Sequence, residues 1–312
     1  MKLGALDVGT NTVLMLVVEI DEHQRVTRLA DFSRITRMGR GVDKLGHLDP
    51  EAAQRTYDAI VDFTREARAL GVDKIVTAAT SALRDASDGP DFIARVKAGA
   101  DLELDVISGE AEADLSYLAV RYGLKLDPAE KVLIIDIGGG STELIRADPG
   151  QDRIGVSLQI GSVRLTERCV KHDPPDDSDV AQLRATIDHA LDDLQWRYRP
   201  DRMVGIAGTV TTVCAVSLGL TTYDSTIVHG HRLPLAEVTR VTNLFRTLPV
   251  AERKKLPGLL EGRADVIFAG ASILERIMAR FEVDAVTVSD QGVRWGLVWR
   301  ALGHKGLNAA SR

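Results

Sequence analysis

Two short glycine-rich turns carry the residue types that phosphate chemistry requires. In the first turn, Asp7 is followed by Gly9 and Thr10–Thr12, and in the second, Asp136 is followed by Gly138–Thr142. A tight turn of Gly, Ser and Thr leaves several backbone N–H groups pointing the same way, and such a concave set of donors binds phosphate oxygens. An Asp before the turn can hold Mg²⁺, which prefers one or two carboxylates together with substrate phosphates. One such turn would favour an ordinary hairpin, but two matching turns favour a phosphate site.

Acidic side chains near the second turn and at a predicted helix start are further candidates. Glu143 lies seven positions after Asp136, and a hairpin would fold the two back toward each other. This pair is either a metal or water-positioning site, or Glu143 is a strand residue that faces solvent. Glu110, Glu112 and Asp114 begin a predicted helix, where acids complement the helix dipole. A positioned Glu could instead take a proton from water that attacks phosphorus, and spacing alone favours neither interpretation.

Basic residues offer two more candidate phosphate contacts. Arg84 follows a predicted buried strand, where its planar guanidinium can bind phosphate or pair with Asp85 or Asp88. The stretch 25–44 holds six basic residues against two acidic ones. It is either a track for a long polyanion or, as is more usual for a charge run, a solvated face.

The elements that must position these residues occur twice along the chain. Strands predicted at 2–7 and 12–20 flank the first turn, and 24–38 continues as mixed strand. Strands at 131–137 and 142–147 flank the second turn, and the two Asp residues are 129 positions apart. We interpret this restart as an internal repeat. Duplicated halves that face each other would bring both turns to one cleft.

Helices are predicted between the strands, and the first is the best delimited. Asp49 is its N-cap, Pro50 occupies the first helical position and Gly71 ends it. The other predicted helices are 90–98, 110–122, 163–171, 180–197, 211–218, 235–248, 263–281 and 292–302, and the other strands are 74–79, 104–107, 154–160, 203–207 and 285–289. The prediction is an α/β chain with domains 1–125 and 126–312, whose last helix, 292–302, can pack back on the first domain.

Composition sets limits on the class of protein. At 312 residues the chain has room for two domains of ~150 residues each, and 45% hydrophobic with 27% charged residues is ordinary globular composition. Aromatic residues are only 4%, which argues against a stacking platform for single-stranded nucleic acid. The net charge of -6 gives no overall attraction for polyanions, so a phosphate-rich ligand requires a local site.

The remaining sequence signals concern cofactors and location. Neither a Walker A pattern nor the GxGxxG dinucleotide fingerprint is present, and the two cysteines form no CxxC pair, which favours a reducing compartment. The longest apolar run near the N-terminus, Val13–Val18, is far shorter than the roughly 20 residues that span a bilayer. We expect a cytoplasmic protein that binds neither nucleic acid nor membranes.

An ordered set of motifs resembles one known family. The motifs are Asp7–Thr12, Ala79–Ala86, Ile107–Ala113, Asp136–Glu143, Gly205–Thr209, Arg263–Asp265 and Ser289–Arg294. In this order they resemble the exopolyphosphatase/guanosine pentaphosphate phosphohydrolase family of the actin, sugar-kinase and Hsp70 superfamily, in its short two-domain form. The resemblance runs over about residues 2–302. It implies two ribonuclease-H-like domains with the active site in the cleft between them.

The resemblance also implies roles for individual residues. Glu112 resembles the catalytic base of the family, although Ala111 stands where a second Glu is frequent. Asp136 and Glu143 resemble the metal-associated carboxylates, and Asp7 is a further metal candidate from its place before the first turn. Phosphate ligands are expected at Thr10, Asn11, Thr12, Arg84, Gly138, Gly139, Gly140, Ser141 and Thr142. Mg²⁺ is the implied cofactor, with Mn²⁺ as the alternative, and the implied assembly is a homodimer.

The expected reaction is Mg²⁺-dependent hydrolysis of a phosphoanhydride by in-line attack of water. Phosphoryl transfer depends mainly on positioning and electrostatics, which suits two phosphate-binding turns. The expected substrate is inorganic polyphosphate, which would lose its terminal orthophosphate. The alternatives are a guanosine pentaphosphate 5′-phosphohydrolase of the stringent response, a non-catalytic alarmone sensor, and an ATP-dependent kinase of the same superfamily. The sequence does not rank substrates by chain length.

Overall fold

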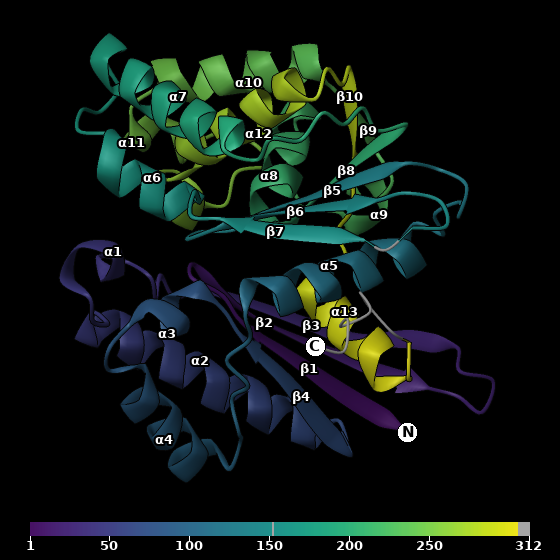
Figure 1. Cartoon of the computed structure of the whole chain (residues 1–312). Coiled ribbons are helices and arrows are strands. Elements are labelled where there is room, and N and C mark those ends of the chain that lie inside the picture. Colours follow the sequence, from purple (N-terminus) through teal and green to yellow (C-terminus); the bar gives the residue numbers. More distant parts are fainter. Residues whose placement is uncertain (152, 305–312) are drawn as a thin grey trace. The chain divides into compact units, whose positions relative to one another are not determined.

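The computed structural model describes residues 1–151 and 153–304 (Figure 1). The chain divides into two compact units. The first contains Met1–Ala119 together with helix α13 (Val293–Ala301), and the second contains Val120–Gly292. The division falls within helix α5 (Gly109–Gly123), before the boundary predicted at residue 126.

The sheet of the first unit has four strands in the order β3-β2-β1-β4. Its strands are β1 (Lys2–Val8), β2 (Thr12–Ile20), β3 (Val26–Ile35) and β4 (Lys74–Ala79). The first three form an antiparallel meander, and β4 pairs parallel with β1. This meander confirms the predicted N-terminal hairpin and its continuation.

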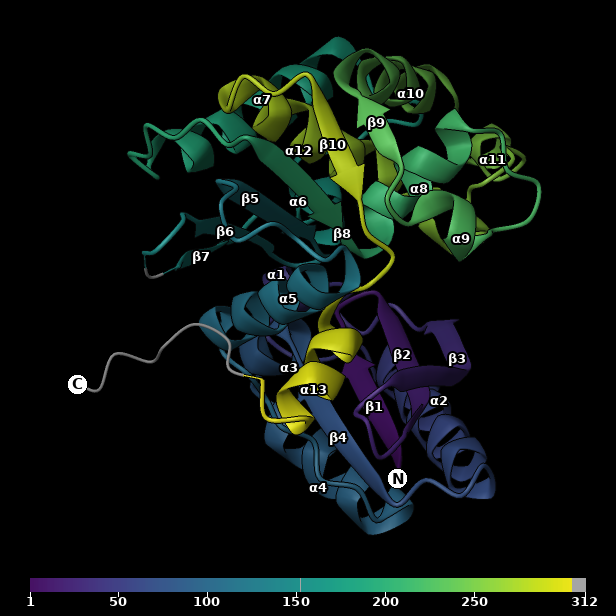
Figure 2. The ribbon, with the colours of Figure 1, turned by 90° about the vertical axis from the view of Figure 1, so that its right-hand side faces the viewer.

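Helices cover both faces of this sheet (Figure 2). Leu6 and Val8 of β1 pack with α2 (Pro50–Ala69) and α4 (Gly89–Ala100). Leu3 and Ala5, which point the other way because side chains alternate along a strand, pack with α5 and α13. Asp7 is two positions after Ala5, so its side chain points to the same face, which α5 and α13 cover.

The helix predicted from Pro50 is confirmed, whereas the strand predicted at 104–107 is wrong. Asp49 caps α2 by accepting a 2.8 Å hydrogen bond from the Ala52 N–H. At 104–107 the only pairing with a strand is an isolated parallel bridge between Ala79 and Val106. The pairing does not continue as a regular ladder, because the Asp105 N–H donates to the Thr77 side chain and the Thr77 hydroxyl donates to the Glu103 carbonyl, both at 2.9 Å. Two short helices of the first unit, α1 (Val42–Leu45) and α3 (Ser81–Asp85), were not predicted.

The sheet of the second unit has six strands in the order β7-β6-β5-β8-β10-β9. Its strands are β5 (Val132–Ile137), β6 (Thr142–Ala147), β7 (Ile154–Leu158), β8 (Arg202–Ile206), β9 (Arg232–Pro234) and β10 (Ala285–Val288). β5, β6 and β7 are antiparallel neighbours, and β8 pairs parallel with β5. The large core of this unit lies on the face to which Leu133, Ile135 and Ile137 point.

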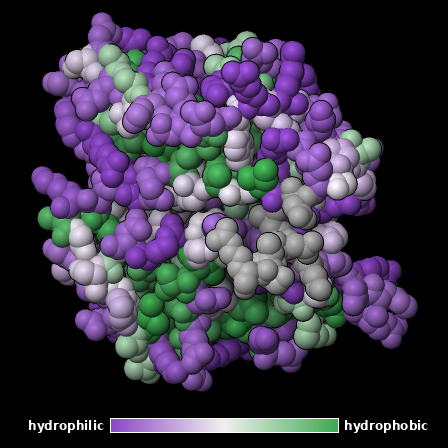
Figure 3. Space-filling model, in the orientation of Figure 1, coloured by the Kyte–Doolittle hydropathy of each residue, from purple (hydrophilic) through white to green (hydrophobic). Residues whose placement is uncertain are grey.

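The helices of the second unit are α6 (Ser162–Cys169), α7 (Asp177–Asp192), α8 (Ala207–Ser217), α9 (Ser225–Val228), α10 (Leu235–Thr247), α11 (Val250–Arg253) and α12 (Ile267–Arg280). The single helix predicted at 263–281 is wrong at its start, because a 3-10 turn, Glu261–Arg263, precedes α12. The visible surface over α7 and α10 is largely hydrophilic (Figure 3), as expected for helices that bury one face. Among the described residues, no helix has both the length and the apolar character needed to cross a bilayer.

The predicted internal repeat is visible in the pairing of the strands. The orders β3-β2-β1-β4 and β7-β6-β5-β8 correspond, and in each unit the fourth strand is parallel to the first of its meander. The pair that closes the first hairpin is Val8 with Val13, and the pair that closes the second is Ile137 with Thr142. Val8 and Ile137 are 129 positions apart, and so are Val13 and Thr142. The same interval separates Asp7 from Asp136.

Candidate active site

The first glycine-rich turn connects β1 to β2 and is held through its carbonyl groups. The Gly9 N–H donates to the Thr12 carbonyl at 3.0 Å, which closes the turn. The carbonyl groups of Thr10 and Asn11 accept three backbone hydrogen bonds of 2.8–3.0 Å from the segment 36–39. Within the described residues, the backbone N–H groups of Thr10 and Asn11 donate no hydrogen bond. The turn therefore retains donors for a ligand.

The side chains of this turn are buried and polar. Thr10, Asn11 and Thr12 are each less than one-tenth exposed. The hydroxyl groups of Thr10 and Ser81 are 2.7 Å apart. The Asn11 amide nitrogen is buried and has no hydrogen-bond partner in the described part of the chain. Because an unsatisfied buried donor is costly, this nitrogen is a further group that an anionic ligand would satisfy.

Arg84 and Glu112 reach the same edge of the first sheet from two different helices. β4 leads into α3, which carries Arg84, and the bridge of Ala79 with Val106 leads into α5, which carries Glu112. Arg84 Nη1 donates to the Ile107 carbonyl at 2.9 Å and lies 3.7 Å from Glu112 Oε2. The alternative partner, Asp85, is 4.0 Å from Arg84 Nε. Arg84 therefore lies closer to Glu112 than to its neighbour in sequence.

Glu112 is the most enclosed of the three acids at the start of α5. It is 8% exposed, whereas Glu110 is exposed and Asp114 is half-buried. A carboxylate in this position benefits from the helix dipole and from the nearby guanidinium of Arg84. The structure thus separates one enclosed acid from two that the sequence could not distinguish.

The second turn connects β5 to β6 and repeats the geometry of the first. The Gly138 N–H donates to the Ser141 carbonyl at 3.0 Å, as Gly9 does to Thr12. The carbonyl groups of Gly138 and Gly139 accept backbone hydrogen bonds of 2.9–3.1 Å from residues 162–164 at the start of α6.

The second turn is bonded to α6 through its carbonyl groups, whereas among the described residues its amide groups are not used in this way. Arg164 Nε donates to the Gly140 carbonyl at 2.7 Å, so α6 holds the turn through side chain as well as backbone. In the described ranges the N–H groups of Gly139, Gly140 and Ser141 donate no hydrogen bond. These three amides form the kind of concave donor set that binds phosphate. The hydroxyl of Thr142, by contrast, already donates to the Ile160 carbonyl at 2.6 Å.

Asp136, Glu143 and Ser157 form a row across three neighbouring strands. Asp136 pairs in register with Glu143, and Glu143 pairs in register with Ser157. Ser157 Oγ donates to Glu143 Oε1 at 2.7 Å. Asp136 is 6% exposed and Glu143 is fully buried. Directly opposite carboxylates in an antiparallel pair repel each other, so two buried ones fit a site for a hard divalent cation such as Mg²⁺.

Asp7 has no matching carboxylate in the first unit. It pairs in register with Leu14, which occupies the place of Glu143 in the repeat. The first unit therefore offers one carboxylate at the position where the second unit offers two.

The start of α8 adds a basic group that the sequence analysis left without a role. β8 ends at Ile206, in register with Asp136, so α8 begins at the same edge of the sheet as the second turn. The guanidinium of Arg263 rests on Gly208, where a Cβ would lie 2.1–2.2 Å from its atoms. Burial lowers the pKa of Arg263 to about 10. The first turn of a helix carries a partial positive charge. The start of α8 and the guanidinium of Arg263 together therefore suit a bound anion.

Arg263 could have been identified earlier, because Gly205–Thr209 and Arg263–Asp265 both belong to the motif set. Ser157 gave no comparable signal in the sequence.

Part of the basic stretch 25–44 is paired with acids. Arg25 contacts Asp21 at 2.7 Å, and Arg34 contacts Asp62 at 2.9 Å. These two arginines sit on exposed surface. The contacts support the solvated-face interpretation for this part of the stretch.

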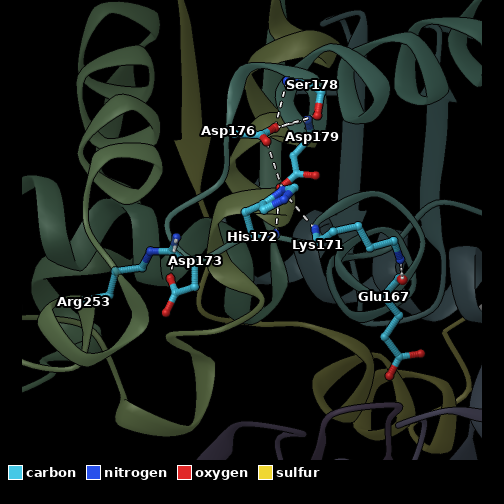
Figure 4. Close-up of polar contacts among 8 residues, drawn as sticks. All are labelled: Glu167, Lys171, His172, Asp173, Asp176, Ser178, Asp179 and Arg253. Carbon is cyan, nitrogen blue, oxygen red and sulfur yellow. Dashed lines mark hydrogen bonds and ion pairs between the residues drawn. The ribbon is translucent and has the colours of Figure 1, made fainter.

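A group of possible metal ligands at the start of α7 is accounted for by helix capping (Figure 4). Asp176 accepts from the Ser178 and Asp179 N–H groups, both at 2.9 Å. Asp179 accepts from the Lys171 and His172 N–H groups, and His172 Nδ1 lies 3.0 Å from Asp176 and 3.2 Å from Asp179. Burial acts to raise the pKa of Asp179, but these backbone donors hold it below its ordinary value.

Comparisons with known proteins identify the family of the chain. A family model described as the Ppx/GppA phosphatase family matches residues 16–305. Exopolyphosphatase 2 of Mycobacterium tuberculosis is 33% identical over 95% of this chain and 97% of its own length, and exopolyphosphatase 1 of Mycobacterium leprae is 31% identical over 97% and 90%. The structure of the Aquifex aeolicus Ppx/GppA family member aligns with a TM-score of 0.82 at 31% identity, covering 97% of each chain. With these matches across nearly its whole length, the chain belongs to the Ppx/GppA phosphatase family.

Proposed function

We propose that this protein is an exopolyphosphatase, which hydrolyses the terminal phosphoanhydride of inorganic polyphosphate and releases orthophosphate. Membership of the Ppx/GppA phosphatase family supports the reaction class, and relatives named exopolyphosphatases support the substrate. The observation that carries the proposal is the repeated turn. In each unit, an amide-lined turn follows an acidic residue at the end of a buried strand.

In the proposed reaction, groups in each unit bind phosphate oxygens of the substrate. The turn amides, the Asn11 amide nitrogen and the guanidinium of Arg84 hold phosphate oxygens. The side chain of Arg263 serves as a further phosphate contact at the start of α8. Thr12 and Thr142 shape the turns in which they lie.

Glu112 takes the proton from the attacking water. The water oxygen bonds to the terminal phosphorus, the phosphoanhydride bond breaks, and the shortened chain leaves with the bridging oxygen. Asp136 and Glu143 would hold Mg²⁺, or Mn²⁺ in its place, and Asp7 is a further candidate ligand. When bound, the cation neutralises negative charge that develops on the transferred group.

Several finer features belong to the same proposal. Guanosine pentaphosphate is the second candidate substrate, and its use would link the protein to the stringent response. A cytoplasmic homodimer is the proposed working form, on the basis of family membership. The enclosed acids Glu112, Asp136 and Glu143 support turnover over binding alone.

Orthophosphate release from long polyphosphate, short polyphosphate, guanosine pentaphosphate and ATP, measured with Mg²⁺ and with a chelator, tests this function. We expect metal-dependent release from a polyphosphate. Release from guanosine pentaphosphate alone would place the protein in alarmone metabolism, and preferential hydrolysis of ATP would favour the kinase-like alternative. No release from any substrate would contradict a hydrolase.

A further inference from the structure

We propose that Ser157 is a positioning residue of the divalent-cation site, which it serves by holding the carboxylate of Glu143. This inference rests on the proposed function, because it assigns a role to a residue that supports the carboxylate pair. Ser157 lies on β7, at the edge of the sheet, and it is half-buried. None of the motifs in the sequence includes it.

Three neighbouring strands bring these residues into one row. Asp136 on β5, Glu143 on β6 and Ser157 on β7 are directly paired, so their side chains share one face of the sheet. This face is opposite to the one from which Ile135 and Leu144 enter the large core. Glu143 therefore has a like charge on one side and a hydroxyl donor on the other.

The carboxylate of Glu143 is held by a hydrogen bond from Ser157. Ser157 Oγ donates to Glu143 Oε1 at 2.7 Å, a short distance typical of a hydroxyl bound to a carboxylate. A Glu side chain has three rotatable bonds, and repulsion from Asp136 would turn its carboxylate away. The hydrogen bond opposes this movement and keeps the carboxylate in the row. Groups that orient a metal-binding side chain in this way typically change metal affinity or activity about 10- to 100-fold when they are removed.

The first unit contains the same row without the central acid. Asp7 pairs with Leu14, and Leu14 pairs with Ser33 on the edge strand β3. Ser33 thus occupies the place of Ser157 in the repeat, but its neighbour has no carboxylate. Of these two serines, only Ser157 therefore has a carboxylate on the residue opposite it. Ser33→Ala is consequently a matched control for Ser157→Ala.

Direct binding of Mn²⁺, measured by electron paramagnetic resonance on the full chain without substrate, is the primary test. We expect Ser157→Ala to weaken Mn²⁺ binding about 10-fold or more. Ser157→Thr, which keeps the hydroxyl on a β-branched side chain suited to a strand, should restore binding to near the wild-type value. Ser33→Ala should bind Mn²⁺ like the wild type. Circular dichroism of each variant without metal confirms that the fold is kept.

Activity provides the second readout. In Ser157→Ala, the Mg²⁺ concentration for half-maximal phosphate release from polyphosphate should rise by a similar factor, and excess Mg²⁺ should restore most of the rate. Wild-type Mn²⁺ binding by folded Ser157→Ala, an equal loss in Ser33→Ala, or no recovery in Ser157→Thr would each overturn the role of Ser157. If the wild type binds Mn²⁺ but releases no phosphate, the proposed function fails while the binding measurement still decides the role of Ser157.

Discussion

Replacing Asp136 by Asn should make the protein more stable when divalent cations are absent. Asp136 and Glu143 are opposite each other in an antiparallel pair, and both are buried. The Cβ atoms of two residues in such a pair are about 5 Å apart. Two unit charges at this distance repel by about 3 kcal/mol at an effective dielectric constant of 20. Asn keeps the size of the side chain and removes the repulsion, so we expect a gain of about 1–3 kcal/mol in the free energy of unfolding.

Thermal unfolding in a chelator and in excess Mg²⁺ measures this effect. For a unit of this size, each kcal/mol corresponds to about 2–4 °C in Tm, so Asp136→Asn should raise Tm in the chelator by several degrees. The wild type should gain stability from Mg²⁺, by about 2.7 kcal/mol at a concentration 100 times Kd. Asp136→Asn should lose most of that gain.

Asp7→Asn is the matched control, because Asp7 faces Leu14 and has no opposing carboxylate in its strand pair. It should not raise Tm in the chelator. The reasoning is refuted if Asp136→Asn lowers Tm in the chelator, or if it responds to Mg²⁺ as the wild type does. Either result would mean that the two carboxylates are ordinary structural partners.

Two further predictions concern the second unit. Gly161→Ala would place a Cβ 2.4–2.6 Å from backbone atoms of Gly139 and Gly140, so it should lower the unfolding free energy by about 1–3 kcal/mol in denaturant titrations and reduce phosphate release; unchanged values would contradict a tightly seated turn. The pKa of Asp179 lies below its ordinary value of 3.8 in the folded state, so the stability it provides is present above pH 3.8 and is lost as pH falls through the folded pKa. Asp179→Asn should therefore reduce the fall in the free energy of unfolding below about pH 4, as measured by urea titrations at several pH values. If the variant loses stability in acid as steeply as the wild type, Asp179 does not provide this stability.

Local sequence patterns were sufficient to predict the hairpins, the turns and the repeat. Each turn lies between two strands that are adjacent in sequence, so glycine content and alternating hydrophobicity define it within about a dozen residues. Asp136 and Glu143 are joined by the same hairpin, and their pairing follows once the turn is recognised. The helix from Pro50 was equally well marked, because its cap and its end are both local signals.

Contacts between distant segments could not be predicted in this way. Arg84 approaches Glu112 only because the single bridge of Ala79 with Val106 sets where α5 begins. Ser157 reaches Glu143 through the pairing of β6 with β7. Alternation in the sequence predicts the face of a strand to which a residue points, but not the residue opposite it on the next strand. The strand predicted at 104–107 failed for a related reason, since backbone groups of Glu103 and Asp105 bond to the side chain of Thr77, a contact between distant segments that alternation in the sequence does not reveal.

The most direct test of the proposed reaction is the initial rate of orthophosphate release from polyphosphate by Glu112→Gln, measured beside the wild type at saturating Mg²⁺. Gln keeps the shape of the side chain but cannot take a proton from water, and general bases typically contribute about 10²- to 10⁴-fold to a rate. Glu110→Gln, which changes an exposed acid in the same helical turn, is the matched control. The account predicts a fall of at least about 100-fold for Glu112→Gln and a normal rate for Glu110→Gln, whereas a near wild-type rate for Glu112→Gln would contradict it.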